Sequence, residues 1–257
     1  MSLLSIDHLT KRFGGLTAVS DVSLDINQQE IVGLIGPNGA GKSTLFNLIT
    51  GVYVPTEGSI DMQVDHQEVS LIGRSADKIN DLGLARTFQN IRLFKDMTVK
   101  ENILIAMDNK QGTSLMHSIL RTQTYYDNRD KLHHKADQLL EHFGLADEAN
   151  NKAKNLAYGQ QRRLEIVRAL ATEPKIIFLD EPAAGMNPNE TQELLDLIRM
   201  IRDEFKVTVV LIEHDMSLVM KVCERIYVLE YGRLIAEGSP HEIQNNQAVI
   251  NAYLGGA

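Results

Sequence analysis

The sequence predicts an α/β fold with a mainly parallel sheet, an antiparallel β layer at the N-terminus and an inserted α-helical lobe. Three observations support this prediction. Short stretches near the N-terminus alternate apolar and polar residues, as half-buried strands do. Apolar strands alternate with helical segments in the second half. A polar, helix-rich stretch without strand signals lies between these two regions.

The N-terminal layer is expected at Leu4–Ile6 and Val22–Ile26, where alternation predicts strands with one polar face. From Glu30 the pattern changes to the continuous apolar run IVGLIG, which predicts a buried strand. A glycine-rich loop and a helix over 43–50 follow this strand, and Gly51 ends the helix.

The second half continues the alternation of helices and apolar strands. Helices are expected at 160–172, 189–205 and 215–222, and strands at 176–179, 207–212 and 226–229. The helical stretch covers 98–155, in which 109–128 is expected to be a loop or a loosely packed helical insertion. We therefore predict one domain over 1–257, with a core at 1–90 and 160–257 and a helical subdomain at about 91–159.

Composition restricts the possible partners. The 34 acidic and 26 basic residues give a net charge of -8, which disfavours binding to a nucleic acid backbone. Cys223 is the only cysteine, so an internal disulfide is impossible, and the N-terminus lacks the pattern of a secretory signal. Apolar runs are far shorter than the ~20 residues of a membrane-spanning helix. We expect a cytoplasmic protein whose membrane role, if any, depends on other chains.

One segment matches the phosphate-binding pattern G-x-x-x-x-G-K-[ST] between a predicted strand and a predicted helix. Its residues, with the one that follows, are Gly36, Pro37, Asn38, Gly39, Ala40, Gly41, Lys42, Ser43 and Thr44. The glycines let backbone N–H groups surround a β-phosphate, Lys42 can reach the β- and γ-oxygens, and Ser43 can ligate Mg²⁺. The loop predicts a P-loop NTPase core and leaves kinase, GTPase and ATPase chemistry open.

Three polar residues follow apolar strands of the predicted parallel sheet. Asp180 and Glu181 end one strand, and His214 follows another. Because ligands bind beyond the carboxyl ends of such strands, all three are expected near the phosphates. Asp180 would hold Mg²⁺ through water, Glu181 would act as general base on the attacking water, and His214 would bond the γ-phosphate. Each residue taken alone has an alternative interpretation: the two acids as solvated residues at a strand end, and His214 as a structural histidine.

Together with a helix start at Leu156, these elements resemble the ABC ATPase family over essentially the whole chain. The residues after Leu156 are Ala157, Tyr158, Gly159 and Gln160. The resemblance implies ATP and Mg²⁺ as ligands and a head-to-tail pair in which this LAYGQ segment contacts the neighbour's ATP. It also implies that Phe13 stacks on adenine and that Gln89, in RTFQN, lies near Mg²⁺ and the attacking water.

Three positions depart from the general family pattern. Ala157 stands where the signature motif has serine, so it cannot donate a hydroxyl hydrogen bond to a γ-phosphate. Tyr158 stands where the motif has its first glycine. In the loop 184–187 after the acid pair, Asn187 replaces the usual aspartate and keeps a hydrogen-bonding group without the charge.

Longer phrases are similar to the ATP-binding subunit of bacterial branched-chain amino acid importers. They are LAYGQQRRLEIVRAL, DEPAAGMNP, LIEHDMSLVM, an insertion near 108–130 and the ending VINAYLGGA. The resemblance implies a homo- or heterodimer with a second ATPase subunit, two permease chains, an external solute-binding protein, and a peripheral location on the cytoplasmic face of the inner membrane. It also implies that a permease helix docks at 92–98, where a plain loop is the alternative.

Several alternatives stay open at this point. ABC ATPases that serve urea import or lipopolysaccharide export share many of the same sequence segments. A nucleotide-switched factor acting on ribosomes or DNA would instead predict tandem cassettes, coiled-coil arms or a basic face, and none of these features occurs in the sequence. A GTP switch would need an N-K-x-D element, but Asn151 and Lys152 are followed by Ala153 and Lys154.

Overall fold

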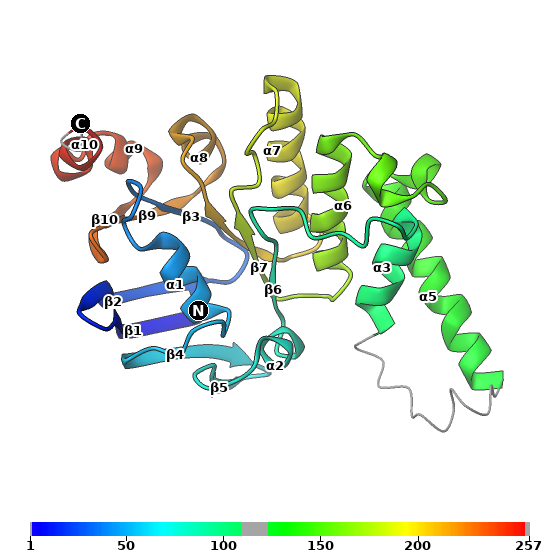
Figure 1. Cartoon of the computed structure of the whole chain (residues 1–257), viewed down its shortest axis with the longest axis horizontal. Helices are drawn as coiled ribbons and strands as arrows, with labels where there is room; N and C mark the ends of the chain where they lie inside the picture. Colours follow the sequence, from blue (N-terminus) through cyan, green and yellow to red (C-terminus); the bar gives the residue numbers. More distant parts are fainter. Residues whose placement is uncertain (1, 109–122, 255–257) are drawn as a thin grey trace. The chain divides into compact units, whose positions relative to one another are not determined.

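A computed structural model describes residues 2–108 and 123–254 of the chain (Figure 1). These residues form two compact units. Unit 1 consists of Met1–Arg86 and Lys175–Ala257, and unit 2 of Thr87–Pro174. The predicted lobe at 91–159 falls within the range of unit 2. Part of the expected insertion, 109–122, lies outside the described residues.

The first sheet of unit 1 is the antiparallel layer that the N-terminal alternation predicts. Its strands are β1 (Ser2–Phe13), β2 (Leu16–Asn27), β4 (Glu57–Val64) and β5 (Gln67–Ser70), in the order β2-β1-β4-β5. Each neighbouring pair is antiparallel. The strands of the first hairpin are much longer than the expected apolar cores, because backbone pairing continues through their polar ends.

The second sheet of unit 1 is mainly parallel. Its strands are β3 (Ile31–Ile35), β6 (Leu84–Arg86), β7 (Ile176–Asp180), β8 (Thr208–Ile212), β9 (Arg225–Glu230) and β10 (Arg233–Gly238). They are ordered β10-β9-β3-β8-β7-β6, and only the β9–β10 pair is antiparallel. Every residue of β3, β7 and β8 is buried, as expected for parallel strands covered on both faces.

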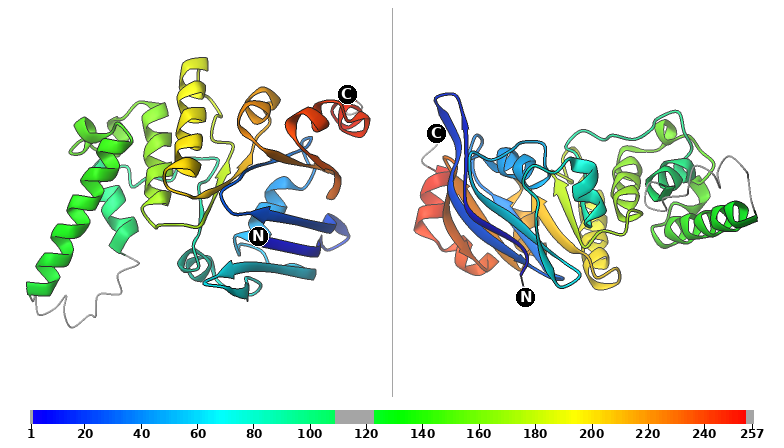
Figure 2. Two further views of the ribbon diagram at one scale, coloured as in Figure 1. Left: turned by 180° about the vertical axis from the view of Figure 1, so that it is seen from behind. Right: turned by 90° about the horizontal axis from the view of Figure 1, so that it is seen from below.

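Helices cover both faces of this second sheet (Figure 1, Figure 2). They are α1 (Lys42–Ile49), α2 (Ala76–Asp81), α7 (Pro188–Asp203), α8 (Met216–Val222), α9 (Pro240–Gln244) and α10 (Gln247–Leu254). Helix α1 lies between the two sheets, where Leu45 and Phe46 are completely buried in a core to which both sheets contribute. Phe46 also packs edge-on against Phe178 of β7, with ring centroids 4.9 Å apart. This packing fixes the start of α1 near the strand ends.

Unit 2 is helical, as the sequence predicts. It contains α3 (Val99–Asp108), α5 (Gln123–His142), short 3₁₀ helices at Ala146–Glu148 and Ala153–Asn155, and α6 (Tyr158–Leu170). Helix α3 packs on both α5 and α6. Among its described residues, the β structure is one isolated bridge between Thr98 and Lys152.

The predicted elements of the second half occur with ends shifted by one or two residues. The helix expected at 160–172 is α6, which begins at Tyr158 and ends at Leu170. The helices expected at 189–205 and 215–222 are α7 and α8, and the three expected strands are β7, β8 and β9. Helix ends depend on capping groups, which periodicity alone does not locate. The predicted α/β class with an antiparallel layer and a helical lobe is confirmed.

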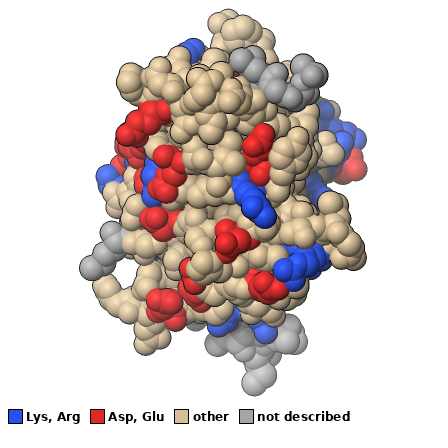
Figure 3. All heavy atoms as spheres, turned by 90° about the vertical axis from the view of Figure 1, so that its left-hand side faces the viewer, with Lys and Arg blue, Asp and Glu red and all other residues tan. Residues whose placement is uncertain are grey.

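No helix within residues 2–108 and 123–254 is long and apolar enough to cross a membrane. On the side of unit 1 that carries α9 and α10, acidic and basic side chains are interspersed among uncharged ones (Figure 3).

Candidate functional site

The phosphate loop of unit 1 connects β3 to α1, in the context that the sequence predicts. Two of its glycines are required by close backbone contacts. A Cβ on Gly36 would lie 2.1 Å from the carbonyl oxygen of Leu229, and one on Gly41 would lie 2.5 Å from that of Ala18. Gly41 also has φ +99° as the N-cap of α1. The N-terminus of α1 is thereby left open to an anion.

Lys42 extends back along this loop. Its Nζ donates hydrogen bonds to the carbonyl oxygens of Gly36 at 2.6 Å and Pro37 at 2.9 Å. Burial lowers the pKa of Lys42, whereas the nearby charge of Glu181 raises it. The ammonium group thus lies inside the loop, on the side that carries Glu181, where it can exchange carbonyl partners for phosphate oxygens.

A cavity of about 620 Å³ opens beside the phosphate loop. Its lining residues are Leu16, Thr17, Ala18, Asn38, Gly39, Ala40, Gly41, Lys42, Ser43, Thr44, Glu181, His214 and Tyr231. The structure therefore brings most of the predicted loop together with Glu181 and His214. Sequence reasoning missed Leu16–Ala18 of β2 and Tyr231, because strand pairing and the β9–β10 turn bring them to the loop from distant parts of the chain. In that turn the N–H of Gly232 donates a hydrogen bond to the carbonyl oxygen of Ala40 at 2.9 Å.

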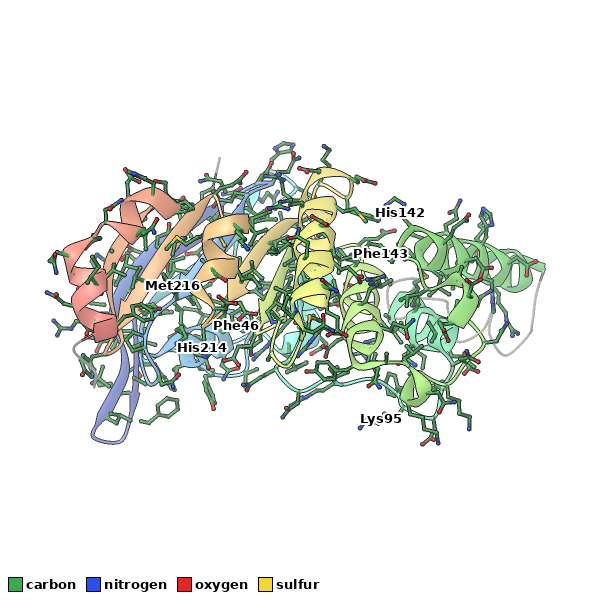
Figure 4. All side chains as sticks on the ribbon, turned by 90° about the horizontal axis from the view of Figure 1, so that it is seen from above. Phe46, Lys95, His142, Phe143, His214 and Met216 are labelled. Carbon is green, nitrogen blue, oxygen red and sulfur yellow. The ribbon has the colours of Figure 1, made fainter. Side chains whose placement is uncertain are left out.

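Glu181 and His214 meet at the ends of two adjacent parallel strands. Residue Asp180 at the end of β7 pairs with Ile212 at the end of β8, so the residues that follow them are neighbours. His214 lies between β8 and α8, which begins at Met216 (Figure 4). The imidazole Nε2 of His214 is 2.5 Å from Oε1 of Glu181. The carboxylate predicted to act as base and the predicted phosphate-binding imidazole are therefore in direct contact beside the phosphate loop.

Asp180 faces a different partner. Its Oδ2 accepts a hydrogen bond from Nη2 of Arg86 at 3.2 Å, and both side chains are nearly buried. The same guanidinium group donates to the Asn47 amide oxygen and the Thr50 hydroxyl at the end of α1. Asp180 is not among the residues that line the cavity. The structure thus places this carboxylate beside the cavity, with Arg86 balancing its charge.

Glu213, between β8 and His214, is a buried acid that sequence reasoning missed. It is 4% exposed, and its carboxylate accepts hydrogen bonds from two backbone N–H groups, those of Ala183 and His214. Burial raises the pKa of Glu213, the two N–H groups lower it, and the charge of Glu181 raises it further. The sequence offers one indication of a role for Glu213, which is its position directly before the candidate histidine.

Phe13 lies at the end of β1 and is 42% exposed. Its ring packs edge-on against Tyr53, with centroids 5.3 Å apart, and the Lys11 ammonium lies 5.0 Å from the ring centre. Phe13 does not belong to the lining of the phosphate-loop cavity, although Leu16 in the next strand does. The adenine-stacking role of Phe13 stays a prediction.

In unit 2, the LAYGQ segment begins α6. Ala157 is the N-cap in an extended conformation, and its N–H donates to Oε1 of Gln160 at 3.2 Å. This bond is half of a capping box, because alanine has no side-chain oxygen to accept from the first turn. Tyr158 is exposed and Gly159 is half-buried. The helix N-terminus therefore lies at the surface of unit 2.

The Gln89 segment is tied to this same helix. The completely buried Arg162 of α6 donates to the carbonyl oxygens of Phe88 and Gln89, each at 2.7 Å, and pairs with Glu165 at 2.8 Å. Glu165 in turn accepts from the N–H of Arg92 at 3.0 Å. Two predicted elements, Gln89 and LAYGQ, are thus linked within one unit through an ion pair on α6.

Asn187 has a structural position that the sequence did not show. It is the N-cap of α7, and its side chain accepts from the N–H groups of Asn189 and Glu190 at 3.0 Å. Glu190 completes the capping box by accepting from the Asn187 N–H. The loop after the acid pair therefore ends in a fully capped helix.

Comparison with known proteins shows the family of the chain. The family model described as "ABC transporter" matches residues 19–184, which is more than half of the chain. The chain belongs to the ABC transporter family. The predicted ATPase activity, coupled to transport in this family, is thereby confirmed. A second model, described as "Branched-chain amino acid ATP-binding cassette transporter", matches residues 233–257 of this cassette.

Curated relatives match the cassette over nearly its full length. The high-affinity branched-chain amino acid transport ATP-binding protein LivG of Escherichia coli K12 is 49% identical over 99% of this chain and 98% of its own. BraF of Pseudomonas aeruginosa, with the same description, is 47% identical over the same shares. The lipopolysaccharide export system ATP-binding protein LptB of Haemophilus influenzae is 34% identical, also over 99% and 98%. The predicted resemblance to importer subunits is confirmed.

Two solved structures have the same fold. The ADP conformation of MJ1267, an ATP-binding cassette of an ABC transporter, superimposes with a TM-score of 0.84 at 30% identity and covers 99% of both chains. A dimeric post-hydrolysis state of the cassette MJ0796, bound to ADP and Pi, has a TM-score of 0.74 at 26% identity over 92% of this chain and 98% of its own.

Proposed function

We propose that this cassette hydrolyses ATP to drive the import of branched-chain amino acids. The observation that carries the proposal is the cavity of unit 1, which combines a glycine-lined phosphate loop with the Glu181–His214 pair. The two relatives of highest identity among those described, LivG and BraF, are named as transporters of this substrate class, and they support the choice of cargo.

The nucleotide would bind with its phosphates in the loop. Backbone N–H groups at the start of α1 and the ammonium of Lys42 would surround the β- and γ-phosphates. Glu181 would accept a proton from the attacking water, and His214 would hold the γ-phosphate while orienting the Glu181 carboxylate. The direct contact between these two side chains, at 2.5 Å, supports the assignment.

The residues present also fit Mg²⁺, which prefers oxygen ligands. Ser43 lines the cavity, and Asp180 is the last residue of β7, directly before the lining residue Glu181. These two residues would hold the ion, Asp180 through water, and Gln89 is the third candidate. When bound, Mg²⁺ would neutralise part of the phosphate charge.

The LAYGQ segment would serve a neighbouring subunit. Its helix N-terminus lies at the surface of unit 2, which is the condition for contacting phosphates held by another chain. The dimeric arrangement of MJ0796 supports pairing of such cassettes. In this proposal Ala157, Tyr158, Gly159 and Gln160 complete the neighbour's ATP site, with backbone N–H groups replacing the missing serine hydroxyl.

The remaining partners follow from the transport function. We propose a homo- or heterodimer of ATPase subunits that docks, at the cytoplasmic face of the inner membrane, on two permease chains served by an external solute-binding protein. Residues 92–98, which include the exposed Phe94, are the proposed docking segment for a permease helix. Nucleic acid is not a partner in this proposal, because the chain is acidic.

The decisive test is reconstitution of the cassette with its permease and ATPase partners in vesicles. ATPase activity should rise several-fold when binding protein loaded with leucine, isoleucine or valine is supplied. Unloaded binding protein is the control. Stimulation by urea alone, or by lipopolysaccharide alone, would overturn the choice of cargo. Stimulation only by ribosomes or DNA would overturn the transport function itself.

A further inference from the structure

Glu213 is a buried carboxylate with no part in the hydrolysis mechanism proposed above, and it lies next to the strand ends that carry Glu181 and His214. We propose that Glu213 is a positioning residue that fixes the backbone of Glu181 and His214 for ATP hydrolysis. The inference rests on the proposed role of Glu181 as general base. Nothing places Glu213 in contact with a phosphate, because it is 4% exposed and does not line the cavity.

The first support is the hydrogen-bond pattern between the two loops. Oε1 of Glu213 accepts from the N–H of Ala183 at 2.9 Å, and Oε2 accepts from the N–H of His214 at 3.3 Å. The N–H of Glu181 meanwhile donates to the carbonyl oxygen of Ile212 at 2.9 Å. Two bonds therefore connect 181–183 with 212–214, and the Glu213 carboxylate accepts one of them while its other oxygen binds the N–H of His214 within its own segment.

The second support is the conformation of Glu181. Its φ is +45°, in the left-handed region that residues with a side chain seldom adopt. Such a conformation persists only where the surrounding structure holds it, and it is found at sites where a side chain must be aimed. The bond from the Ala183 N–H to Glu213 lies two residues after Glu181 in the same turn. Loss of this bond would let the turn relax and would carry the Glu181 carboxylate away from His214.

The third support is the chemistry of the carboxylate. Both backbone partners are donors, so both oxygens of Glu213 must accept. A glutamine has one accepting oxygen, and its NH₂ group would face one of the two N–H groups. A buried group left with such a mismatch loses a hydrogen bond and gains a repulsive contact. An ionised carboxylate is therefore the group that suits this position, despite its burial.

Loss of Glu213 should affect the rate of the chemical step and not the binding of nucleotide. Glu213 holds the base and the histidine but not the phosphate loop, so its loss should lower kcat and leave nucleotide affinity unchanged. Small displacements of a reacting group can cost up to about 100-fold in rate. We expect Glu213→Gln to lower kcat by about 10-fold or more, and Glu213→Asp, which keeps the charge on a shorter stem, to lower it less.

The experiment measures ATP hydrolysis and nucleotide binding in the assembled transporter. Glu224→Gln is the matched control. Glu224 also accepts a backbone hydrogen bond, from the N–H of Ile31 at 3.2 Å, but at the end of β3 that is farther from the phosphate loop. Its kcat should equal that of the unmodified protein. For Glu213→Gln the ATP KM and Kd should stay within about twofold, with the thermal midpoint recorded for all variants. A kcat unchanged by Glu213→Gln would overturn the inference.

A double-mutant cycle with Glu181→Ala separates positioning from general stability. If Glu213 acts through Glu181, adding Glu213→Gln to Glu181→Ala should leave the residual rate unchanged. If the rate losses of the two substitutions multiply in the double variant, Glu213 has a purely structural role. The same conclusion follows if Glu213→Asp lowers kcat as much as Glu213→Gln does. An unmodified complex without ATPase activity would instead refute the proposed function, so the two failures are distinguishable.

Discussion

The phosphate loop and the LAYGQ segment each end in the N-terminus of a helix, but the two helix starts are built differently. Gly41 starts α1 with φ +99° and close backbone contacts, inside a cavity that the same unit supplies. Ala157 starts α6 in an ordinary extended conformation, half-capped by Gln160, at the surface of unit 2. The first helix start is thus enclosed by its own unit and the second is exposed, which supports the proposal that the second acts on a neighbouring subunit.

The largest effect is expected at the first site. Glu181→Gln should lower kcat on the order of 10³-fold, because glutamine cannot accept the proton of the attacking water. ATP binding should persist, so the variant should accumulate as a nucleotide-bound dimer. Steady-state ATPase assays and size-exclusion chromatography with ATP test this. Normal turnover would remove Glu181 from the role of base.

Lys42→Ala should act on binding rather than on chemistry alone. Loss of a charge-assisted contact to phosphate should raise the ATP Kd by about 10-fold to 100-fold. Equilibrium binding of a fluorescent nucleotide measures the change. Lys175→Ala is the control, because Lys175 precedes β7 at the other end of the strand and pairs with the exposed Asp65. Equal affinities for the two variants would contradict the phosphate role of Lys42.

Asn187→Ala tests the fully capped helix of unit 1. Removing this side chain takes away an acceptor for the N–H groups of Asn189 and Glu190, which should cost about 1 kcal/mol of unfolding free energy. The thermal midpoint should fall by about 2–4 °C. Asn187→Asp restores the acceptor and should return the midpoint to its original value, and failure to do so would exclude capping as the cause.

Ala157→Ser is the converse change in unit 2 and should have the smallest effect. The added hydroxyl can accept from the first turn of α6 and complete the capping box with Gln160, which should add about 0.5–1 kcal/mol to the stability of this unit. ATP affinity of the isolated subunit should not change, whereas turnover of a mixed dimer should rise at the partner's site. A changed affinity of the isolated subunit would contradict action in trans.

Sequence patterns predicted the parts of the molecule that depend on local order. Burial of whole strands, glycines in the loop and acids at strand ends all follow from short segments, so the sheet and the Glu181–His214 pair could be expected. Contacts between distant segments could not. The pairing of Arg86 with Asp180, the edge-on contact of Phe13 with Tyr53 and the bonds of Glu213 depend on strand order and on side-chain directions that periodicity does not contain.

The buried pair on α6 has a consequence for how this chain can change over generations. Loss of Arg162 alone would leave Glu165 charged and without its guanidinium partner in the interior, at a cost of about 3–5 kcal/mol. The carbonyl oxygens of Phe88 and Gln89 would lose the bonds from the Arg162 guanidinium at the same time. We therefore expect substitutions at Arg162 and Glu165 to be tolerated only in concert, whereas the loop at 88–92, which takes part through backbone groups, can change its side chains more freely.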